Sequence, residues 1–506
     1  MLRACGSLLL AFCLQSSYVC AQSGADRSTV PLTTEQKVEK LTAAVAQAQL
    51  QMETYQKELI ELRQQLAALQ QQMAAEKASL SPAPLPATAN AGNAEAAAAG
   101  AASLEEIRER QAVEESQIAT HEVSKVETQS KYPLKVSGLL LFNGFVNTRQ
   151  VDISASPAYA IPGPGSTGLS LRQTVLGLDA RGPHLFGATS NADLRVDFFA
   201  NGTQSNYAAS GILRLRTAHA ALNWRSTEAF IALDRTILEP NAPSSLVSIA
   251  QPELAWAGYL WSWSPQIGVS HSFALPDSSR IQMQAALIDT ADPQWPGSAA
   301  GSSPVTQSEL SRWPGTETRI AYRHGERGTG PEVGVGGYFS PHRDESGDMY
   351  DAWAGTMDLR FPFAKHFELI TNAYRGQALA GLGGGGYVNY FYQNTYQYGA
   401  WTEIAHALDD VGGWAQLKAR AGQRMEMNAG YGTDNPFAKE IHTAMSNPGA
   451  VSYPGLARNR SFFSNAIYSP SAYLLFSLEY KRLWTNYGLG PTYFSDSIGI
   501  GAGYKF

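Results

Sequence analysis

Cysteine is almost absent from this chain of 506 residues. The three cysteines, Cys5, Cys13 and Cys20, all lie in the N-terminal segment. We expect that segment to be removed, since Arg3, the apolar stretch 8–14 and a small-residue site before Gln22 are typical of a secretory signal peptide over residues 1–21. Lipid attachment at Cys20 is the alternative, which Val19 disfavours because a small residue is wanted there. The mature chain then has no disulfide and no thiolate metal site.

Long apolar runs are also absent. After the signal segment no stretch has the ~18 to 20 uninterrupted apolar residues that a transmembrane helix needs. An exported chain of this kind is either released or inserts as a β-barrel.

Motifs for catalysis and metal binding are lacking too. The nine histidines are scattered without HExxH or another paired spacing. The glycine run 381–386 has no Lys-Ser/Thr after it, and no basic patch supports nucleic-acid binding. We therefore expect no enzyme, no cofactor, no metal and no nucleic-acid partner.

An uninterrupted heptad pattern covers residues 35–75, where it predicts an α-helical coiled coil and hence a homo-oligomer. A single amphipathic helix lying on a core is the alternative, disfavoured by the narrow apolar stripe. Residues 79–102, rich in Ala and Pro, predict a linker, and 103–130 a short polar connecting helix. The apolar seam consists of Val38, Leu41, Val45, Ala48, Met52, Tyr55, Leu59, Leu62, Leu66, Leu69 and Met73.

From residue 131 to 506 the chain alternates apolar and polar residues in short segments separated by loops rich in Gly, Pro, Asn and Ser. The alternation and the long-short asymmetry of the loops predict an all-β transmembrane β-barrel of about 16 antiparallel strands. Two more strands within 377–411 are the alternative. The expected strands are 134–149, 170–181, 188–199, 211–224, 228–236, 258–273, 279–290, 314–324, 331–340, 350–361, 365–376, 412–421, 423–431, 459–469, 471–485 and 495–506.

The last segment ends on an aromatic residue. Ile498, Ile500 and Ala502 alternate with small residues up to Tyr504 and Phe506. This pattern predicts a closing strand that pairs with the first strand near 136–147. The terminal Phe506 resembles the signal that the bacterial barrel-assembly machinery reads. Trp256, Tyr259, Trp261 and Trp263 are expected either at a membrane-interface girdle or in ordinary packing.

The barrel segment resembles the trimeric outer-membrane porins of the DcaP-like and phosphate types. The resemblance is carried by the sixteen-strand pattern, the phrase VSGLLLFNG at 136–144 and the terminal Phe506, and for the DcaP-like group also by the N-terminal coiled coil. It implies a homotrimer in the outer membrane with its coil in the periplasm. No tract resembles the lysine ladder of phosphate-selective relatives, so the resemblance implies no anion selectivity.

Pore selectivity has two candidate sources in the sequence. Most of the net charge of -6 arises upstream of the barrel, so net charge predicts no ion preference. Arg172, Arg195, Arg214 and Arg216 occupy polar-facing positions of the second to fourth strands, where they would attract anions and carboxylates. The alternative is that Asp179, Asp193 and Asp197 neutralise them.

The connection 237–257 is the second candidate, as a loop that constricts the pore. Glu239 and Glu253 would then face the arginines across the opening. Packing at a trimer interface, or capping of the barrel, is the alternative.

The sequence therefore predicts an outer-membrane porin that passes small hydrophilic solutes, anions among them. The alternatives are an envelope tether built on the coiled coil, and a secreted soluble β-rich enzyme or carbohydrate-binding protein.

Overall fold

A computed structural model describes the barrel segment of the chain. The described residues are 133–200, 211–292, 305–325, 330–397, 400–446, 453, 455–488 and 490–506, with side chains left out at 394–397 and 400–403. The signal peptide, coiled coil, linker and connector predicted over 1–130 lie outside these residues. No helix among the described residues has the length and apolar character needed to cross a membrane.

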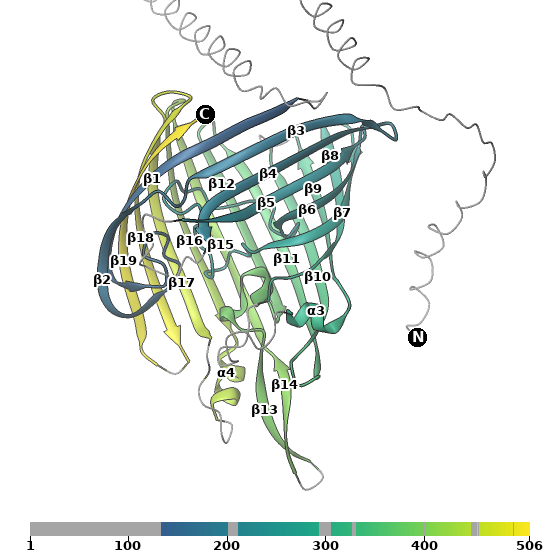
Figure 1. The fold of residues 1–506 in the computed structure, drawn as a ribbon, viewed down its shortest axis with the longest axis vertical. Coiled ribbons are helices and arrows are strands. Elements are labelled where there is room, and N and C mark those ends of the chain that lie inside the picture. The colour runs from purple at the N-terminus through teal and green to yellow at the C-terminus, as the bar shows by residue number, and fades with distance from the viewer. Residues whose placement is uncertain are drawn as a thin grey trace, which may run out of the picture. The chain divides into compact units, whose positions relative to one another are not determined.

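Nineteen strands are found in the described chain, and seventeen of them form one antiparallel sheet (Figure 1). The sheet strands are β1 (Leu134–Val151), β2 (Ala160–Ser170), β3 (Val175–Leu185), β4 (Ala188–Ala200), β5 (Ile212–Asn223), β6 (Thr227–Arg235), β7 (Trp263–Ala274), β8 (Ser279–Ile288), β9 (Gly315–His324), β10 (Glu332–Arg343), β11 (Met349–Phe363), β12 (Phe367–Gln377), β15 (Asp409–Ala421), β16 (Met425–Pro436), β17 (Leu456–Tyr468), β18 (Leu474–Tyr487) and β19 (Thr492–Lys505).

The sheet closes on itself through its first and last strands. The β1–β19 register runs from Leu139 opposite Lys505 to Asn147 opposite Ser497. The backbone N–H of Phe506 also donates to the Gly138 carbonyl at 3.1 Å. The predicted closure by the C-terminal strand is confirmed, and it leaves neither terminal strand with an open edge.

The wall has sixteen strand positions because β2 and β3 share one of them. The first half of β1 pairs with β3 and the second half pairs with β2. Between Ser170 and Val175 the chain continues but leaves the strand conformation. The predicted number of strands is confirmed. The prediction of a loop over 150–169 is wrong for residues 160–169, since a segment rich in Gly and Pro has the composition of a loop but pairs with β1 here.

The segment 377–411 contains two strands that do not enter the wall. They are β13 (Tyr390–Gln397) and β14 (Ala400–Ala407), which pair only with each other. The possibility of eighteen wall strands is thereby excluded.

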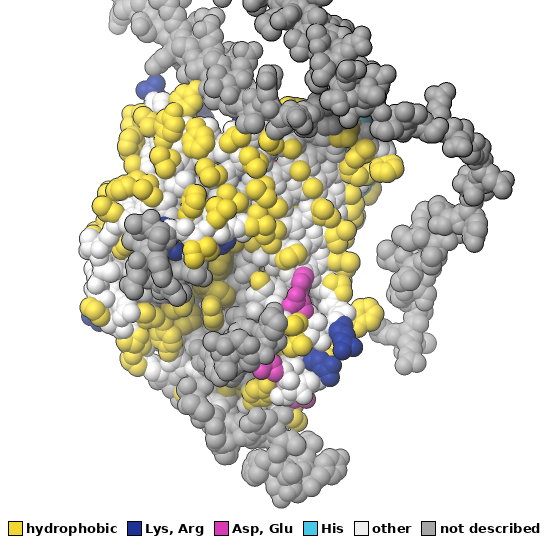
Figure 2. Space-filling model, viewed as in Figure 1, with side chains coloured by type: hydrophobic (Ala, Val, Ile, Leu, Met, Phe, Trp, Pro, Cys, Tyr) yellow, Lys and Arg dark blue, Asp and Glu magenta, His cyan; other side chains and the backbone are white. Residues whose placement is uncertain are grey.

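Alternation along the strands separates an apolar outer face from a polar inner one. On β18, Leu478 and Tyr480 are 59% and 39% exposed, whereas Glu479 and Lys481 between and beside them are buried. Figure 2 shows hydrophobic side chains spread over the outer face of the wall. Water-facing side chains on the inside and apolar ones outside are what a strand between hydrocarbon and a lumen requires.

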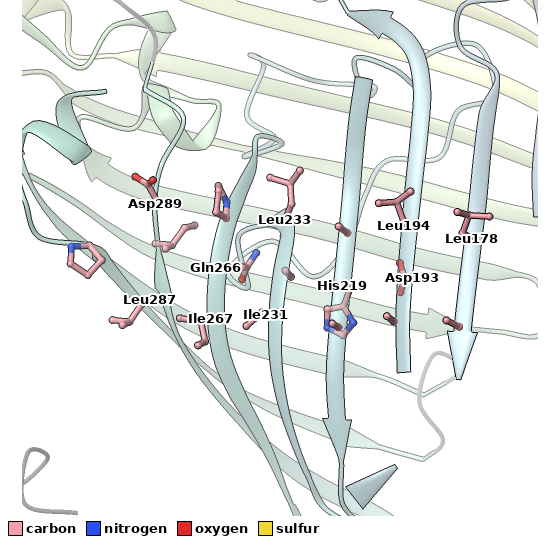
Figure 3. A pocket seen from close by; sticks show the side chains of 18 of the residues that line it. Leu178, Asp193, Leu194, His219, Ile231, Leu233, Gln266, Ile267, Leu287 and Asp289 are labelled. Carbon is pink, nitrogen blue, oxygen red and sulfur yellow. The ribbon is translucent and has the colours of Figure 1, made fainter. Parts of the chain in front are cut away.

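The outer face stays apolar even where it is concave. A depression of about 730 Å³ crosses β3 to β8 and is bordered by Leu178, Ile231 and Ile267 (Figure 3). The small side chains of Ala192 and Ala220 line it as well. Contact with hydrocarbon is therefore possible over this part of the wall too.

The two ends of the barrel differ in their connections. At the short-turn end the strands are joined by 186–187, 224–226, 275–278, 325–331, 364–366, 422–424 and 469–473. The long-loop end carries 152–159, 201–211, 236–262, 289–314, 378–408 and 437–455, and two short connections at 344–348 and 488–491. The helices α3 (Gln307–Ser311) and α4 (Ala438–Met445) and the β13–β14 hairpin lie at the long-loop end (Figure 1). The predicted difference in loop length between the two ends is confirmed, except for the short connections 344–348 and 488–491 at the long-loop end.

A glycine-rich segment, 378–389, packs inside the long-loop end and is called here the glycine loop. It contains the 3-10 turns η2 (Ala380–Leu382) and η3 (Gly385–Tyr387), and nearly all its residues are buried. The backbone N–H groups of Gly385 and Gly386 donate to the carboxylates of Asp410 (2.9 Å) and Asp434 (2.7 Å). At Gly386, φ is +59° and a Cβ would lie 2.1 Å from the Leu456 carbonyl oxygen, so the site requires glycine.

Substitution on the outer face tests this architecture. Arg at Leu478, in the apolar band, should destabilise the barrel by about 2–4 kcal/mol, because the charge then lies in hydrocarbon. Arg at Leu474, at the short-turn end of the same strand, should cost only about 0–1 kcal/mol. Urea titration of folding into lipid vesicles measures both. Equal costs for Leu478→Arg and Leu474→Arg would contradict the assignment of the membrane-facing band.

Candidate functional site: an inner loop and the pore beside it

The connection between β6 and β7, residues 236–262, lies within the barrel and is called here the inner loop. Side chains from several wall strands donate to its backbone carbonyls: Asn372 on β12 to Leu238 (3.0 Å), and Asn465 on β17 to Ser244 (2.8 Å). The buried donors Asn143 on β1, Gln173 after β2 and Asn459 on β17 do the same. The loop therefore crosses the barrel from β6 to the opposite wall.

These wall contacts provide hydrogen-bond partners for the backbone of an irregular segment inside the protein. Buried backbone groups without a hydrogen-bond partner are costly, and the inner loop has no ladder to satisfy them. The amide of Gln173 makes three such bonds: its Nε2 donates to the Val247 carbonyl at 2.6 Å, and its Oε1 accepts from the backbone N–H groups of Ile249 (2.8 Å) and Ala250 (3.0 Å). The sequence left a constricting loop and packing at a trimer interface or capping of the barrel as alternatives for 237–257. The path described here, which includes a few residues on either side, runs inside the barrel.

A buried ion pair fastens the loop to β18. Lys481 Nζ lies 2.6 Å from Glu253 Oε2, and both side chains are almost fully buried. The same ammonium donates to Ser248 Oγ at 2.9 Å and to the Pro157 carbonyl at 3.0 Å. Glu253 was expected to face the arginines across the opening; that expectation is wrong, because its cationic partner is Lys481.

Glu239 is likewise buried against the wall. Its Oε1 accepts from the Trp414 indole N–H at 3.0 Å, and the side chain is 1% exposed. Burial raises the pKa of Glu239 well above its usual range, with Trp414 and Arg235 acting in the opposite direction. None of the four predicted arginines is its hydrogen-bond or ion-pair partner.

Two of the four predicted arginines are neutralised by aspartates. Arg195 lies 2.6 Å from Asp179 and 4.0 Å from Asp193. Arg214 binds Asp197 through two bonds of 3.0 and 2.6 Å and donates to the Ala250 carbonyl of the inner loop at 2.8 Å. Arg195 and Arg214 are therefore neutralised by aspartates, which was the alternative expected from the sequence.

Arg172 and Arg216 have different surroundings. Arg172 is buried in the break between β2 and β3, where it donates to the Ala200 carbonyl at 3.2 Å and lies over the Phe199 ring. Arg216 makes no ion pair and no side-chain hydrogen bond among the described residues, and the Asp197 carboxylate that acts on its charge already pairs with Arg214. Its guanidinium lies 5.2 Å from the centre of the Trp263 ring. Of the predicted cluster, Arg216 is therefore the arginine without an ion pair or hydrogen bond among the described residues.

A β-bulge directs Arg216 inward. Opposite β5, Arg195 faces Thr217 and the next residue, Val196, faces Leu215, so Arg216 is an extra residue in the ladder. A bulge of this kind re-aims side chains locally. Both Arg216 and its neighbour Thr217 consequently line the interior.

Two cavities remain between the inner loop and the wall formed by β4 to β11. The first, called the arginine chamber, has a volume of about 500 Å³ and is lined by Arg195, Arg216, Asp234, Tyr259 and Trp263 together with apolar loop residues. The second, called the vestibule, has about 550 Å³ and extends toward the short-turn end, where it reaches Asn223, Glu228, Arg323, Glu332 and Arg360. Thr217, Asp234 and Arg235 line both.

Ion pairs hold most vestibule arginines in place. Arg319 lies 2.7 Å from Asp358 and 2.9 Å from Glu332, and Arg323 lies 2.8 Å from Glu332. Arg360 lies 3.1 Å from Glu368. Each of these arginines therefore has a carboxylate partner, and the charges of this group are largely balanced.

The sequence predictions missed several residues of this site. Trp263 and Tyr259 line the arginine chamber, and Trp256 and Trp261 pack inside against the glycine loop, so none of these four forms a girdle at the membrane surface. Lys481 was missed as well, although its inward position on an alternating strand was a usable signal. Within the described residues no group of three or more His, Cys, Asp or Glu side chains could hold a metal ion.

The fold and its interior define a porin-type β-barrel. No protein-family model matches the chain and no curated protein sequence matches it. Among solved structures it is similar to the outer-membrane channel DcaP of Acinetobacter baumannii, with a TM-score of 0.54 and 15% identity over 76% of this chain and 100% of that chain. An anion-selective porin from Comamonas acidovorans gives a TM-score of 0.46 and 10% identity over 74% of this chain and 100% of that chain. The predicted resemblance to DcaP and other outer-membrane porins is confirmed as a likeness of fold.

The Lys481–Glu253 pair provides a test of the inner loop. Lys481→Met should destabilise the barrel by about 3–5 kcal/mol, because it leaves the Glu253 carboxylate buried without a cation. The double variant Lys481→Met with Glu253→Gln should recover most of that loss. Urea unfolding in detergent measures the free energies. A single variant as stable as the unmodified protein would show that the loop does not depend on this pair.

Proposed function

We propose that this protein is an outer-membrane porin that passes small hydrophilic solutes by passive diffusion, anions among them. The observation that supports it best is the combination of an apolar outer wall with charged interior cavities that the inner loop narrows. A soluble sandwich would bury apolar side chains inside and expose polar ones, which is the reverse arrangement. A transport role also accounts for an interior rich in balanced charge.

The unpaired guanidinium of Arg216 supports a preference for anions. Ion-paired arginines present little net charge to a passing ion, whereas Arg216 adds one cation at the narrow region beside the inner loop. Arg195 and Arg214 add to the local field only what their aspartates leave uncompensated.

The proposed oligomer rests on the heptad pattern of the sequence. We propose a homotrimer whose coiled coil over 35–75 extends into the periplasm, and insertion by the barrel-assembly machinery through Tyr504 and Phe506. Short turns face the periplasm in bacterial barrels, and the C-terminus here lies at the short-turn end (Figure 1). This orientation places the long loops outside the cell.

Planar bilayers with purified protein test the channel directly. We expect stepwise conductance and, in a salt gradient, a reversal potential that indicates preference for anions. Arg216→Gln should lower the anion-to-cation permeability ratio about two- to fivefold, equivalent to about 0.5–1 kcal/mol for one partly screened charge. Arg216→Lys, which retains the charge, should stay close to the unmodified protein.

Two outcomes would count against the proposal. Folded, heat-modifiable protein that forms no channels would overturn the porin function itself. Unchanged selectivity in Arg216→Gln, with normal conductance, would overturn only the role of Arg216.

A further inference from the structure

A carboxylate lines the arginine chamber together with the guanidinium of Arg216. The pairing of β5 with β6 ends at Ala218 opposite Leu233. Just beyond this pair lie Thr217 on β5 and Asp234 on β6, and Arg216 directly precedes Thr217 in the chain. Arg216 and Asp234 both line the chamber. A cation and an anion on adjacent strands thus face one space of about 500 Å³.

The guanidinium of Arg216 is held without using its donors. Trp263 offers the face of its indole, with the guanidinium carbon 5.2 Å from the ring centre, and Arg214 lies at the same distance from that ring. Stacking on a ring uses the flat face of a guanidinium and leaves the N–H groups at its edge available. Two parallel N–H groups match the two oxygens of a carboxylate.

Asp234 is also available to a solute. One of its oxygens accepts the backbone N–H of Arg235 at 2.7 Å, and no ion pair involving Asp234 occurs among the described residues. The nearest guanidinium in sequence, that of Arg235, is bonded to the Tyr259 hydroxyl instead. Arg235 also acts on the charge of Asp234, but no hydrogen bond to the second carboxylate oxygen occurs among the described residues, so the carboxylate retains acceptor capacity.

The other charged groups around the chamber are already engaged. Arg195 pairs with Asp179, and Arg214 pairs with Asp197. A simple anion bound at Arg216 would meet the repulsion of Asp234, whereas a solute that carries both charges close together would satisfy both groups. Apolar residues of the chamber wall, such as Val175 and Ile249, leave room for a short aliphatic substituent.

We infer that the arginine chamber is a binding site for small zwitterions of the α-amino acid class, with the carboxylate on Arg216 and the ammonium on Asp234. The inference rests on the proposed function, since the chamber must be reachable from the lumen. Such a site would distinguish zwitterions from simple anions, and not only anions from cations.

Three solutes of one size distinguish this site from a plain anion site. Alanine carries both charges, lactate replaces the ammonium by a hydroxyl, and alaninol lacks the carboxylate. Solute-induced current noise in bilayers containing the unmodified protein gives each dissociation constant. Alanine should bind more tightly than lactate, and lactate more tightly than alaninol.

Substitutions assign the two charges. Asp234→Asn should weaken alanine binding about tenfold, the usual effect of losing one charged hydrogen bond, and leave lactate binding equal or stronger. Arg216→Gln should weaken both. Asp277→Asn, the same chemical change in an exposed turn at the short-turn end, serves as the matched control and should change neither.

The failure of this inference differs from the failure of the porin function. Channels of normal conductance that bind alanine and lactate equally, in the unmodified protein and in Asp234→Asn alike, would overturn the zwitterion site and leave the porin intact. Comparing alanine with lactate on the unmodified protein tests the zwitterion site even when a variant does not fold. Absence of channels would overturn both.

Discussion

Every backbone N–H and C=O in contact with hydrocarbon must find its partner within the protein, and this constraint shapes the whole chain from residue 133 onward. A sheet meets it only when its two edges pair, as β1 and β19 do here. Closure fixes the alternation, because each strand then has one face in lipid and one in the lumen. The inward positions of the wall residues, such as Arg214 and Lys481, follow from that alternation, whereas the bulge at Arg216 makes two successive residues of β5 face inward.

Closure creates a second requirement, because a sixteen-strand wall encloses more space than its own side chains fill. The inner loop occupies much of that space, and inward amides such as Asn372, Gln416 and Asn465 bind its backbone in place of a ladder. The side of the lumen lined by β12 and β15 to β18 is therefore closed. Space remains on the opposite side, where β4 to β11 carry the charged residues of the chamber and the vestibule.

Periodicity made the wall and its closure predictable from sequence, whereas the side-chain pairs inside the barrel were not predictable. The alternation in β18 and β19 was sufficient to place them and to predict closure. The strand β2 was missed since its prolines and glycines gave it the composition of a loop. Periodicity also placed Arg214 and Arg216 on the inner face, but it gave no means of telling which of them an aspartate neutralises.

The positions of the aromatic residues near 256–263 could not be predicted from sequence either. A tryptophan prefers a membrane interface and a packed interior for similar physical reasons, so sequence left two readings and only the fold separates them. Partners such as Lys481 and Glu253 are distant in sequence and carry no shared pattern. Their pairing depends on the path of the inner loop, which backbone hydrogen bonding to the wall determines.

The inner loop covers one wall of the barrel and leaves cavities along the other, and the two sides should therefore differ in access. Single cysteines at Thr217 and at Asn465, in protein whose native cysteines all lie among residues 1–20, place a thiol on each side. Block of single-channel current by a cationic methanethiosulfonate reagent measures access. The account predicts rapid modification and lowered conductance for Thr217→Cys and no reaction for Asn465→Cys; equal reaction at both positions would contradict it.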